Sequence, residues 1–160
     1  AGDGRMLECR PAAKHLGHGG VVTRVRGEVL RILRENGGVP VVAPIGVDPE
    51  GRRYNVNADH VAGALAAELD AAKLILMTDV AGVLMGKGPR ARLASTLHGS
   101  EVRKLIRSGG IHGGMVPKVE ACLEALAGGT GKAHILDGRA RHALLLEIFT
   151  TSGIGTEIVR

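Results

Sequence analysis

The sequence predicts an α/β protein, built as a three-layer α/β/α sandwich with a mainly parallel central sheet. Short continuous apolar runs occur at 39–48, 73–80 and 132–138, and such runs are typical of strands that are buried on both faces. Segments with helical periodicity lie between these runs, as expected of strand–helix–strand units. At 160 residues, of which 44% are hydrophobic, the chain suits a single domain over 1–160. The inner strands are expected at 41–46, 74–79 and 132–136.

The first part of the chain is expected to add two weaker strands and one helix. The stretches RMLECR (5–10) and GVVTRV (20–25) carry the short apolar content of strands. The stretch GEVLRILREN (27–36) has helical periodicity. Gly37 and Gly38 follow it, and glycines suit the end of a helix.

Three further helices are expected at 58–69, 99–109 and 140–149. The first is rich in alanine and places Asp59 in its first turn, where a carboxylate interacts favourably with the helix dipole. The second has Ser100 as its expected N-cap. The third, ARHALLLEIF, precedes a last short strand in GTEIV near the carboxyl end.

One more helix is expected after Pro117, and it ends at Gly128. Its apolar residues recur at helical spacing: Met115, Val119, Cys122, Leu123 and Leu126. The segment MGKGPRARLAS (85–95) breaks the alternating pattern and is interpreted as an exposed hairpin or loop.

The composition argues against membrane and nucleic-acid partners. No apolar run reaches the roughly 18 residues that a membrane-spanning helix needs. The net charge is +5, but Tyr54 and Phe149 are the only aromatic residues, so the stacking platforms that bases need are lacking. A solvated basic surface explains the charge, and a small anionic ligand is the second interpretation. Cys9 and Cys122 are two separate cysteines rather than a disulfide scaffold, so we expect a cytoplasmic protein.

The stretch YNVNADHVAG (54–63) places three polar side chains at the start of a predicted helix. If the segment before the helix is extended, Asn55 and Asn57 face the same side, and Asp59 follows at once. Helix capping by Asn57 is the simpler explanation. Capping gives no role to Asn55, so a binding function stays open.

The stretch MTDVAGV (77–83) ends a predicted buried strand with Thr78 and Asp79, and Gly82 follows in the turn. Ligands of open α/β sheets bind outside the carboxyl ends of strands, so this pair is a candidate for ligand contact. A local turn in which Asp79 bonds to its own backbone is an equally good explanation.

The stretch GGIHGGMVPKVEA (109–121) places four glycines and Lys118 around a helix N-terminus. Backbone N–H groups at such an end bind anions, and a lysine adds a mobile point charge. A glycine-rich loop beside a surface lysine is the alternative. Four glycines within six residues favour an anion site.

Five stretches occur in order along the chain: APIGVD, YNVNADHVAGALAAEL, KLILMTDVAGVL, GGMVPKVEACLEAL and HILDGRARHALLLEIFTTSGIGTEIV. Together they resemble the amino-acid kinase superfamily and, within it, the N-acetylglutamate kinases. The resemblance runs from about residue 20 to the end. It implies transfer of the γ-phosphate of MgATP to the side-chain carboxylate of N-acetyl-L-glutamate, an early step of arginine biosynthesis.

The resemblance also implies roles for individual residues. Lys118 would stabilise the transferring phosphoryl group, Asp59 would organise the catalytic lysines, and Asn55 and Asn57 would bind the substrate. The implied nucleotide contacts are Thr78, Asp79, Val80, Gly82, Val83, Leu84, Gly110, Ile111 and Gly113. The seven histidines show no metal-ligand spacing such as HExxH, so no metal other than the magnesium of MgATP is expected.

The resemblance also implies arginine as a possible further ligand. His134, Glu147 and Gly153 fall where arginine-inhibited members of the family contact arginine. The simpler interpretation makes His134 an ordinary strand residue and Glu147 a surface charge. A homo-oligomer is also expected.

Only the nucleotide-binding half of these kinases is matched. Their amino-terminal lobe, with a second catalytic lysine, glycine-rich loops and a substrate-binding arginine, has no counterpart that we can find in the 160 residues. A non-catalytic nucleotide- or arginine-binding module is therefore an alternative. Superfamily kinases for aspartate, glutamate, carbamate or UMP are another, although NVNAD together with GGMVPK favours acetylglutamate.

Overall fold

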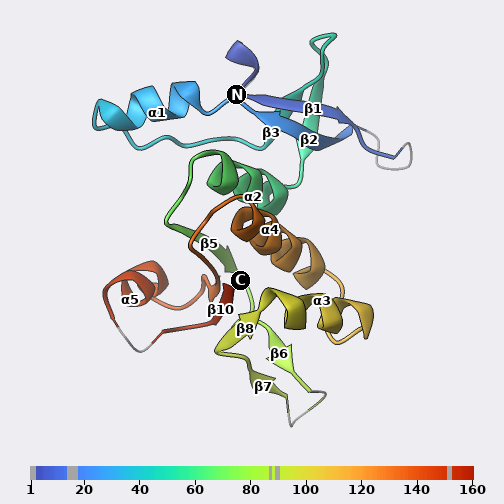
Figure 1. The fold of residues 1–160 in the computed structure, drawn as a ribbon, viewed down its shortest axis with the longest axis vertical. Coiled ribbons are helices and arrows are strands. Elements are labelled where there is room, and N and C mark those ends of the chain that lie inside the picture. The colour runs from blue at the N-terminus through green and yellow to red at the C-terminus, as the bar shows by residue number, and fades with distance from the viewer. Residues whose placement is uncertain (1–2, 14–17, 87, 89–90, 151–152) are drawn as a thin grey trace.

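The computed structural model describes residues 3–13, 18–86, 88, 91–150 and 153–160. In this part of the chain the strands form a closed four-stranded barrel, a four-stranded sheet and a two-stranded ribbon. Figure 1 shows the barrel and helix α1 at one end of the molecule and the four-stranded sheet toward the other end, with helices α2 and α4 between them. The α/β class predicted from the sequence is confirmed.

The barrel has the strand order β1–β2–β4–β3. Antiparallel pairing joins β1 (Leu7–Pro11) to β2 (Gly19–Val25) and β3 (Ile45–Val47) to β4 (Arg53–Val56), and parallel contacts β1–β3 and β2–β4 close the ring. A short 3-10 turn, η1 (Asp3–Arg5), precedes it. Apolar side chains from the barrel, α1 (Glu28–Glu35) and α2 (Ala58–Glu68) form its core: Met6, Leu7, Cys9, Val25, Leu30, Tyr54, Val56 and Val61.

The four-stranded sheet has the order β5–β9–β10–β8. The strands β5 (Lys73–Thr78) and β9 (Lys132–Asp137) are parallel and paired along their whole length. β10 (Thr156–Val159) runs antiparallel to β9 and parallel to β8 (Thr96–His98). The predicted strands near 74–79 and 132–136 are therefore neighbours, so their carboxyl ends meet at one edge of the sheet.

Helices pack on both sides of this sheet. α4 (Met115–Ala127) packs against β5, β9 and β10 and against α2, α3 (Gly99–Arg107) packs against β8 and α4, and α5 (Ala143–Phe149) packs against β9 (Figure 1). Among the described helices, none is both long enough and apolar enough to cross a membrane. The shared core contains the buried side chains of Leu74, Leu76, Val102, Val119, Cys122, Leu126, Ile135 and Ile158.

Most of the predicted element boundaries agree with the structure to within three residues. The stretch at 85–95 is a hairpin, as expected, in which β6 (Leu84–Met85) pairs with β7 (Arg92–Leu93). The prediction of Ser100 as an N-cap is wrong, because α3 already begins at Gly99. His98 is the N-cap instead. Its N–H donates to Glu101 Oε2 at 2.8 Å, and this hydrogen bond closes the first turn of the helix.

The prediction of 41–46 as an inner strand of the main sheet is also wrong. Only Ile45–Val47 is a strand, and it belongs to the barrel. Exposure alternates along the preceding residues: Val42 packs on the barrel core, whereas Val39 and Val41 are 89% and 95% exposed. The continuous apolar run suggested a strand that is buried on both faces. Among the described residues, however, other elements cover only one face of this segment.

Candidate functional site

Two hollows lie at opposite ends of the parallel strands β5 and β9. One, of about 560 Å³, follows the carboxyl end of β5. The other, of about 620 Å³, surrounds Lys73 and Lys132, the first residues of the two strands. Because ligands of open α/β sheets bind beyond the carboxyl ends of strands, the first hollow is the stronger candidate for a nucleotide site.

The carboxyl-end hollow is built largely from backbone. Its two walls are the loop and hairpin after β5 and the loop that leads into α4. Its lining residues are Val80, Gly82, Val83, Leu84, Gly86, Gly88, Ala91, Gly109, Gly110, Ile111, His112 and Met115. A lining with this many glycines lets a ligand approach the main chain closely.

Glycine is required at two points by the backbone conformation. Gly82 has φ +141°, and a Cβ there would lie 2.6 Å from Thr156 Oγ1, so no other residue fits without movement. Gly113 has φ +58° with open space around it, and it turns the chain into α4, whose N-cap is Gly114. No side chain caps this helix end. Val116 N–H donates to Gly113 O and Pro117 has no N–H, so Gly114 and Met115 offer the first-turn N–H groups that can face an anion.

Lys118 and Asp59 form an ion pair between α4 and α2. The ammonium Nζ lies 3.1 Å from each carboxylate oxygen, so both oxygens accept hydrogen bonds from it. The two side chains are 20% and 18% exposed, so water screens the pair only in part. Lys118 is one helical turn beyond Met115, which lines the carboxyl-end hollow, and therefore stands on the same side of α4.

Cys122 lies on the next turn of α4, next to this pair. Burial raises the pKa of its thiol to about 12, and the negative charge of Asp59 contributes to the rise. The thiol is therefore uncharged at neutral pH and serves as an apolar packing group beside the ion pair.

The two asparagines have different roles in the structure. Asn57 is the N-cap of α2, and its Oδ1 accepts hydrogen bonds from the N–H groups of Asp59 at 2.9 Å and His60 at 3.3 Å. This confirms capping, the simpler explanation of Asn57. Asn55 lies exposed on β4, and its N–H donates to His18 O, so its side chain is not needed for the strand. Substrate binding by Asn55 and Asn57 stays a prediction.

Polar side chains also lie at the carboxyl ends of β5 and β9. Thr78 Oγ1 donates to Asp79 Oδ1 at 3.2 Å. Just after β9, Arg139 Nε and Nη2 donate to Asp137, the last residue of that strand, at 2.9 and 2.8 Å. These hydrogen bonds lower the pKa of the Asp137 carboxyl to about 2. Both strand ends are thus polar, with Thr78 and Asp137 partly buried and Asp79 exposed, although neither Thr78 nor Asp79 lines the hollow itself.

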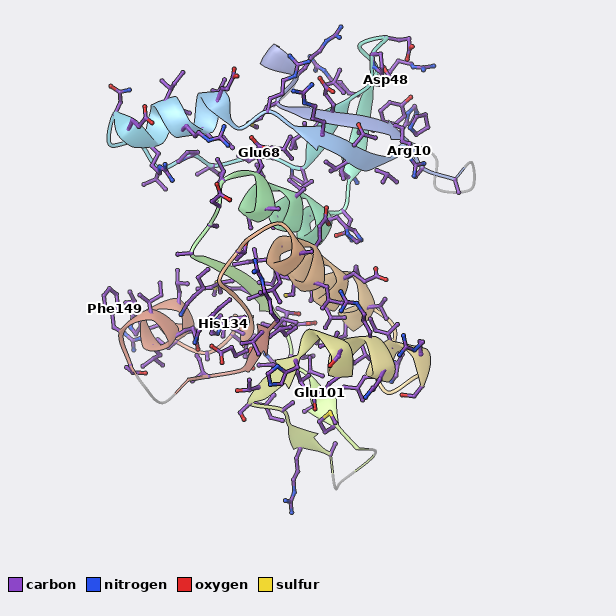
Figure 2. All side chains as sticks on the ribbon, in the orientation of Figure 1. Arg10, Asp48, Glu68, Glu101, His134 and Phe149 are labelled. Atoms are coloured by element: carbon purple, nitrogen blue, oxygen red, sulfur yellow. The ribbon has the colours of Figure 1, made fainter. Side chains whose placement is uncertain are left out.

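The amino-end hollow is lined by charged side chains instead. His134 Nδ1 lies 2.6 Å from Glu147 Oε1, and both side chains are 6% exposed. Lys132 Nζ lies 2.7 Å from Glu157 Oε1, and Lys73 Nζ lies 3.9 Å from Glu147 Oε1. Figure 2 shows His134 in the interior between the sheet and α5. The interpretation of Glu147 as a surface charge is therefore wrong. α5 turns this residue toward β9, and the sequence alone did not show that orientation.

The imidazole of His134 is an incompletely paired group. Among the described residues, its Nε2 has no hydrogen-bond partner, and Glu157 Oε1 lies 3.7 Å away. Burial lowers the pKa of His134, and the ammonium groups of Lys73 and Lys132 act in the same direction, against Glu147 and Glu157. The imidazole is therefore neutral at pH 7 and has one nitrogen free for a ligand.

The structure brings most of the predicted residues together. Six of the nucleotide candidates line the carboxyl-end hollow: Val80, Gly82, Val83, Leu84, Gly110 and Ile111. The three effector candidates, His134, Glu147 and Gly153, all line the amino-end hollow. The sequence did not point to the contributions of Gly86, Gly88, Ala91, His112 and Met115. The glycine content of the 85–95 hairpin is the sequence signal that could have indicated Gly86 and Gly88. In the described residues, no group of three or more His, Cys, Asp or Glu side chains is placed to hold a metal ion.

With this geometry in hand, the chain can be compared with known proteins. Residues 2–137 match the sequence model of the amino acid kinase family, which is most of the chain. The chain belongs to that family.

Individual amino acid kinases show how far the match extends. The chain is 49% identical to the acetylglutamate kinase of Pelotomaculum thermopropionicum, over 96% of this chain and 52% of that protein. It is 52% identical to the acetylglutamate kinase of Symbiobacterium thermophilum, over 91% of this chain and 50% of that protein. The chain thus spans about half the length of these relatives.

A solved structure supports the same fold. The crystal structure of N-acetylglutamate synthase from Neisseria gonorrhoeae complexed with coenzyme A and L-arginine matches with a TM-score of 0.84 and 29% sequence identity. The match covers 98% of this chain and 37% of that one. The α/β architecture with its separate barrel and sheet is therefore shared with a solved structure.

Proposed function

We propose that this chain supplies the nucleotide-binding half of a kinase that uses MgATP to phosphorylate N-acetyl-L-glutamate. The product would be N-acetyl-L-glutamyl 5-phosphate, an intermediate of arginine biosynthesis. The observation that supports the proposal best is the Lys118–Asp59 ion pair, which stands beside a glycine-lined hollow at the N-terminus of α4. Identity of 49–52% to acetylglutamate kinases supports the choice of substrate.

Phosphoryl transfer requires that the two reactants are positioned and that the developing negative charge is compensated. A carboxylate oxygen of acetylglutamate would attack the γ-phosphorus, the bond from phosphorus to the β,γ-bridging oxygen would break, and ADP would leave. Negative charge builds up on the oxygens of the transferring group, so a fixed ammonium and helix N–H groups lower the barrier. Lys118 would supply the ammonium, and Asp59 would hold it in place from α2.

Nucleotide binding can be tested directly on this chain. We expect titration calorimetry with magnesium and the non-hydrolysable analogue AMP-PNP to give saturable heat, and Lys118→Ala to weaken the affinity at least threefold. Lys104→Ala is the matched control, because Lys104 is exposed on α3 and outside the hollow. A folded sample that gives no heat at millimolar nucleotide would contradict the proposal.

Catalysis requires the remaining half of the fold. We expect little or no turnover from the 160 residues alone, and turnover when they are joined to the part of an acetylglutamate kinase that this chain does not match. Hydroxylamine converts an acyl phosphate into a hydroxamate, so hydroxamate formed from acetylglutamate and ATP reports the reaction. Formation with aspartate or glutamate in place of acetylglutamate would favour the other superfamily kinases.

Arginine binding at the amino-end hollow is the second candidate function. The free Nε2 of buried His134 and the nearby carboxylates of Glu147 and Glu157 suit a ligand with a guanidinium group. The structural similarity to a synthase that contains L-arginine supports it. We expect heat with L-arginine and none with citrulline, its neutral analogue, and we expect Glu147→Gln to abolish the arginine signal. Equal heats for both ligands would contradict this role.

The proposed enzyme is a cytoplasmic homo-oligomer. Cys9 and Cys122, which are both free and buried, suit a reducing compartment. Sedimentation of the purified protein and fractionation of the source cells would test these two expectations.

A further inference from the structure

We infer that Gly63 is a positioning residue for the Asp59–Lys118 ion pair. It sets the distance between α2 and α4 one helical turn from the pair, and so fixes where the Lys118 ammonium stands relative to the N-terminus of α4. The functional consequence rests on the proposed phosphoryl-transfer role of Lys118, but the geometric part can be tested without any ligand.

Gly63 lies where the two helices approach most tightly next to the pair. A Cβ at position 63 would lie 2.7 Å from the carbonyl oxygen of Ala121, 3.1 Å from its Cα and 3.2 Å from its carbonyl carbon. All three atoms belong to the backbone of α4, so no side-chain rotation can relieve the contact. A methyl group at this position would therefore push the helices apart.

The position of Gly63 in its helix has no local explanation. Glycine in the interior of a helix costs about 1 kcal/mol relative to alanine, and α2 is otherwise rich in alanine. Gly63 has an ordinary helical conformation, because it is not among the glycines with positive φ. The close approach to Ala121 is the feature that excludes a side chain here.

The approach is coupled to the ion pair through both helices. Asp59 lies four residues before Gly63 on α2, and Lys118 lies three residues before Ala121 on α4, so each is about one turn, or roughly 4.5–6 Å along its helix, from the contact. Relief of the contact needs a separation of about 0.7 Å, the difference between 2.7 Å and the 3.4 Å at which ordinary van der Waals contact begins.

The ion pair has little slack to absorb such a shift. Its two distances of 3.1 Å already lie near the upper end of hydrogen-bond length. A wider helix spacing would lengthen the pair and loosen the hold of Asp59 on the ammonium. The positive charge would then move, and a displacement of this size is enough to affect catalysis strongly.

A second contact between the same helices provides a matched control. A Cβ at Gly128 would lie 2.3 Å from Ala67 Cβ, so Gly128→Ala also separates α2 and α4. Gly128 is ten residues beyond Lys118, which is roughly 15 Å along the helix. Both substitutions should lower the melting temperature, but Gly63→Ala alone should disturb the ion pair.

The test measures the reactivity of the Lys118 amine. Acetic anhydride at limiting dose acetylates lysines, and peptide mass spectrometry gives the rate at Lys118 relative to exposed Lys104. We expect Gly63→Ala to raise this ratio at least threefold, toward the value for Asp59→Asn, in which the pair is absent. Gly128→Ala should leave the ratio within 1.5-fold of the unsubstituted chain. Equal ratios for the two glycine variants, whether both raised or both unchanged, would overturn the inference.

A conservative rescue distinguishes positioning from general destabilisation. Asp59→Glu has one more methylene to span the widened gap, so it should lower the Lys118 ratio when added to Gly63→Ala. In the unsubstituted chain the same change should raise the ratio, because the close spacing places a longer side chain poorly. Should Gly63→Ala fail to fold by circular dichroism, the ratios are compared with trimethylamine N-oxide present, which favours the folded state; equal ratios for the two glycine variants there would overturn the inference.

In the complete enzyme, the same variants separate geometry from function. Gly63→Ala should lower kcat about tenfold with little change in the KM for ATP, whereas Gly128→Ala should change kcat less than twofold. Raised Lys118 reactivity with unchanged kcat would contradict the catalytic role of Lys118 while the spacing role of Gly63 survives.

Discussion

The two ends of the same parallel strands offer two very different hollows. At the carboxyl end of β5 the lining is mainly glycine and apolar side chains, and His112 is its only titratable lining residue among those described. At the amino end, Lys73, Lys132, His134, Glu147 and Glu157 all line the space. The volumes are similar, about 560 and 620 Å³, so size does not distinguish them.

The difference lies in how each end can recognise a ligand. A backbone-lined hollow with an uncapped helix end beside it suits a polyanion that is bound by N–H groups and one ammonium. A hollow lined by paired acids and bases suits a small ligand that carries both charges, since such a ligand replaces existing pairs without leaving a buried charge alone. Under our proposal the nucleotide therefore binds at the carboxyl end and a zwitterion at the amino end.

The largest expected effect concerns Lys118. In the complete enzyme, Lys118→Ala should lower kcat on the order of a hundredfold, with a small change in KM, because its ammonium pairs best with charge that develops in the transition state. Lys132→Ala is the control at the other end of the strands and should leave kcat within threefold. Steady-state assays measure both, and a near-normal kcat for Lys118→Ala would break the assignment of the carboxyl end.

The next effect compares two glycines of the carboxyl end. Gly82→Ala should lower the free energy of unfolding by about 2–3 kcal/mol, because its backbone conformation is nearly restricted to glycine and a Cβ would collide with Thr156. Gly113→Ala should cost about 1–2 kcal/mol, since its left-handed conformation is strained but its surroundings are open.

Urea unfolding of the two glycine variants gives the comparison. Equal losses would mean that the loop after β5 is not held as rigidly as the Val83–Thr156–Ala94 hydrogen bonds imply.

The smallest effect is a pH dependence that belongs to the amino end. Burial lowers the folded-state pKa of His134 below its ordinary value of 6.5, so the unfolded chain binds this proton more readily. Stability should therefore fall as the pH drops from 7.5 through 6.5 to 5.5. Lys73, Lys132, Glu147 and Glu157 are the charged groups that surround the imidazole.

Thermal unfolding at several pH values tests the origin of this slope. His134→Gln should flatten it, while His60→Gln, a change at a partly exposed residue of α2, should leave it unchanged. A slope that survives His134→Gln would place the responsible group elsewhere.

The sequence predicted the local elements well, because each carries its own signal. Capping by Asn57, the simpler of its two interpretations, and a helix that begins near Pro117 both depend on residues that are adjacent in the chain. The buried runs of β5 and β9 were likewise clear. Only the family resemblance indicated that Asp59 acts on a lysine such as Lys118, because neither segment carries a local signal that identifies its partner.

What the sequence could not show depends on tertiary packing. Continuous apolarity at 39–48 predicted an inner strand, but apolarity does not say which element covers each face, and Val41 remains exposed. The burial of Glu147 depends on how α5 sits on β9, a contact between distant segments. The significance of Gly63 became visible only with Ala121 beside it.

The most direct test of the central claim is a map of nucleotide contacts on this chain. Backbone amide NMR spectra recorded during titration with magnesium and AMP-PNP should show shifts at 79–84, 109–114 and Lys118, the carboxyl end of β5 and the start of α4. The amides of Lys73, Lys132 and His134 at the amino end should stay within the spread of the remaining residues. Shifts confined to the amino end, or no shifts at millimolar nucleotide, would contradict the account.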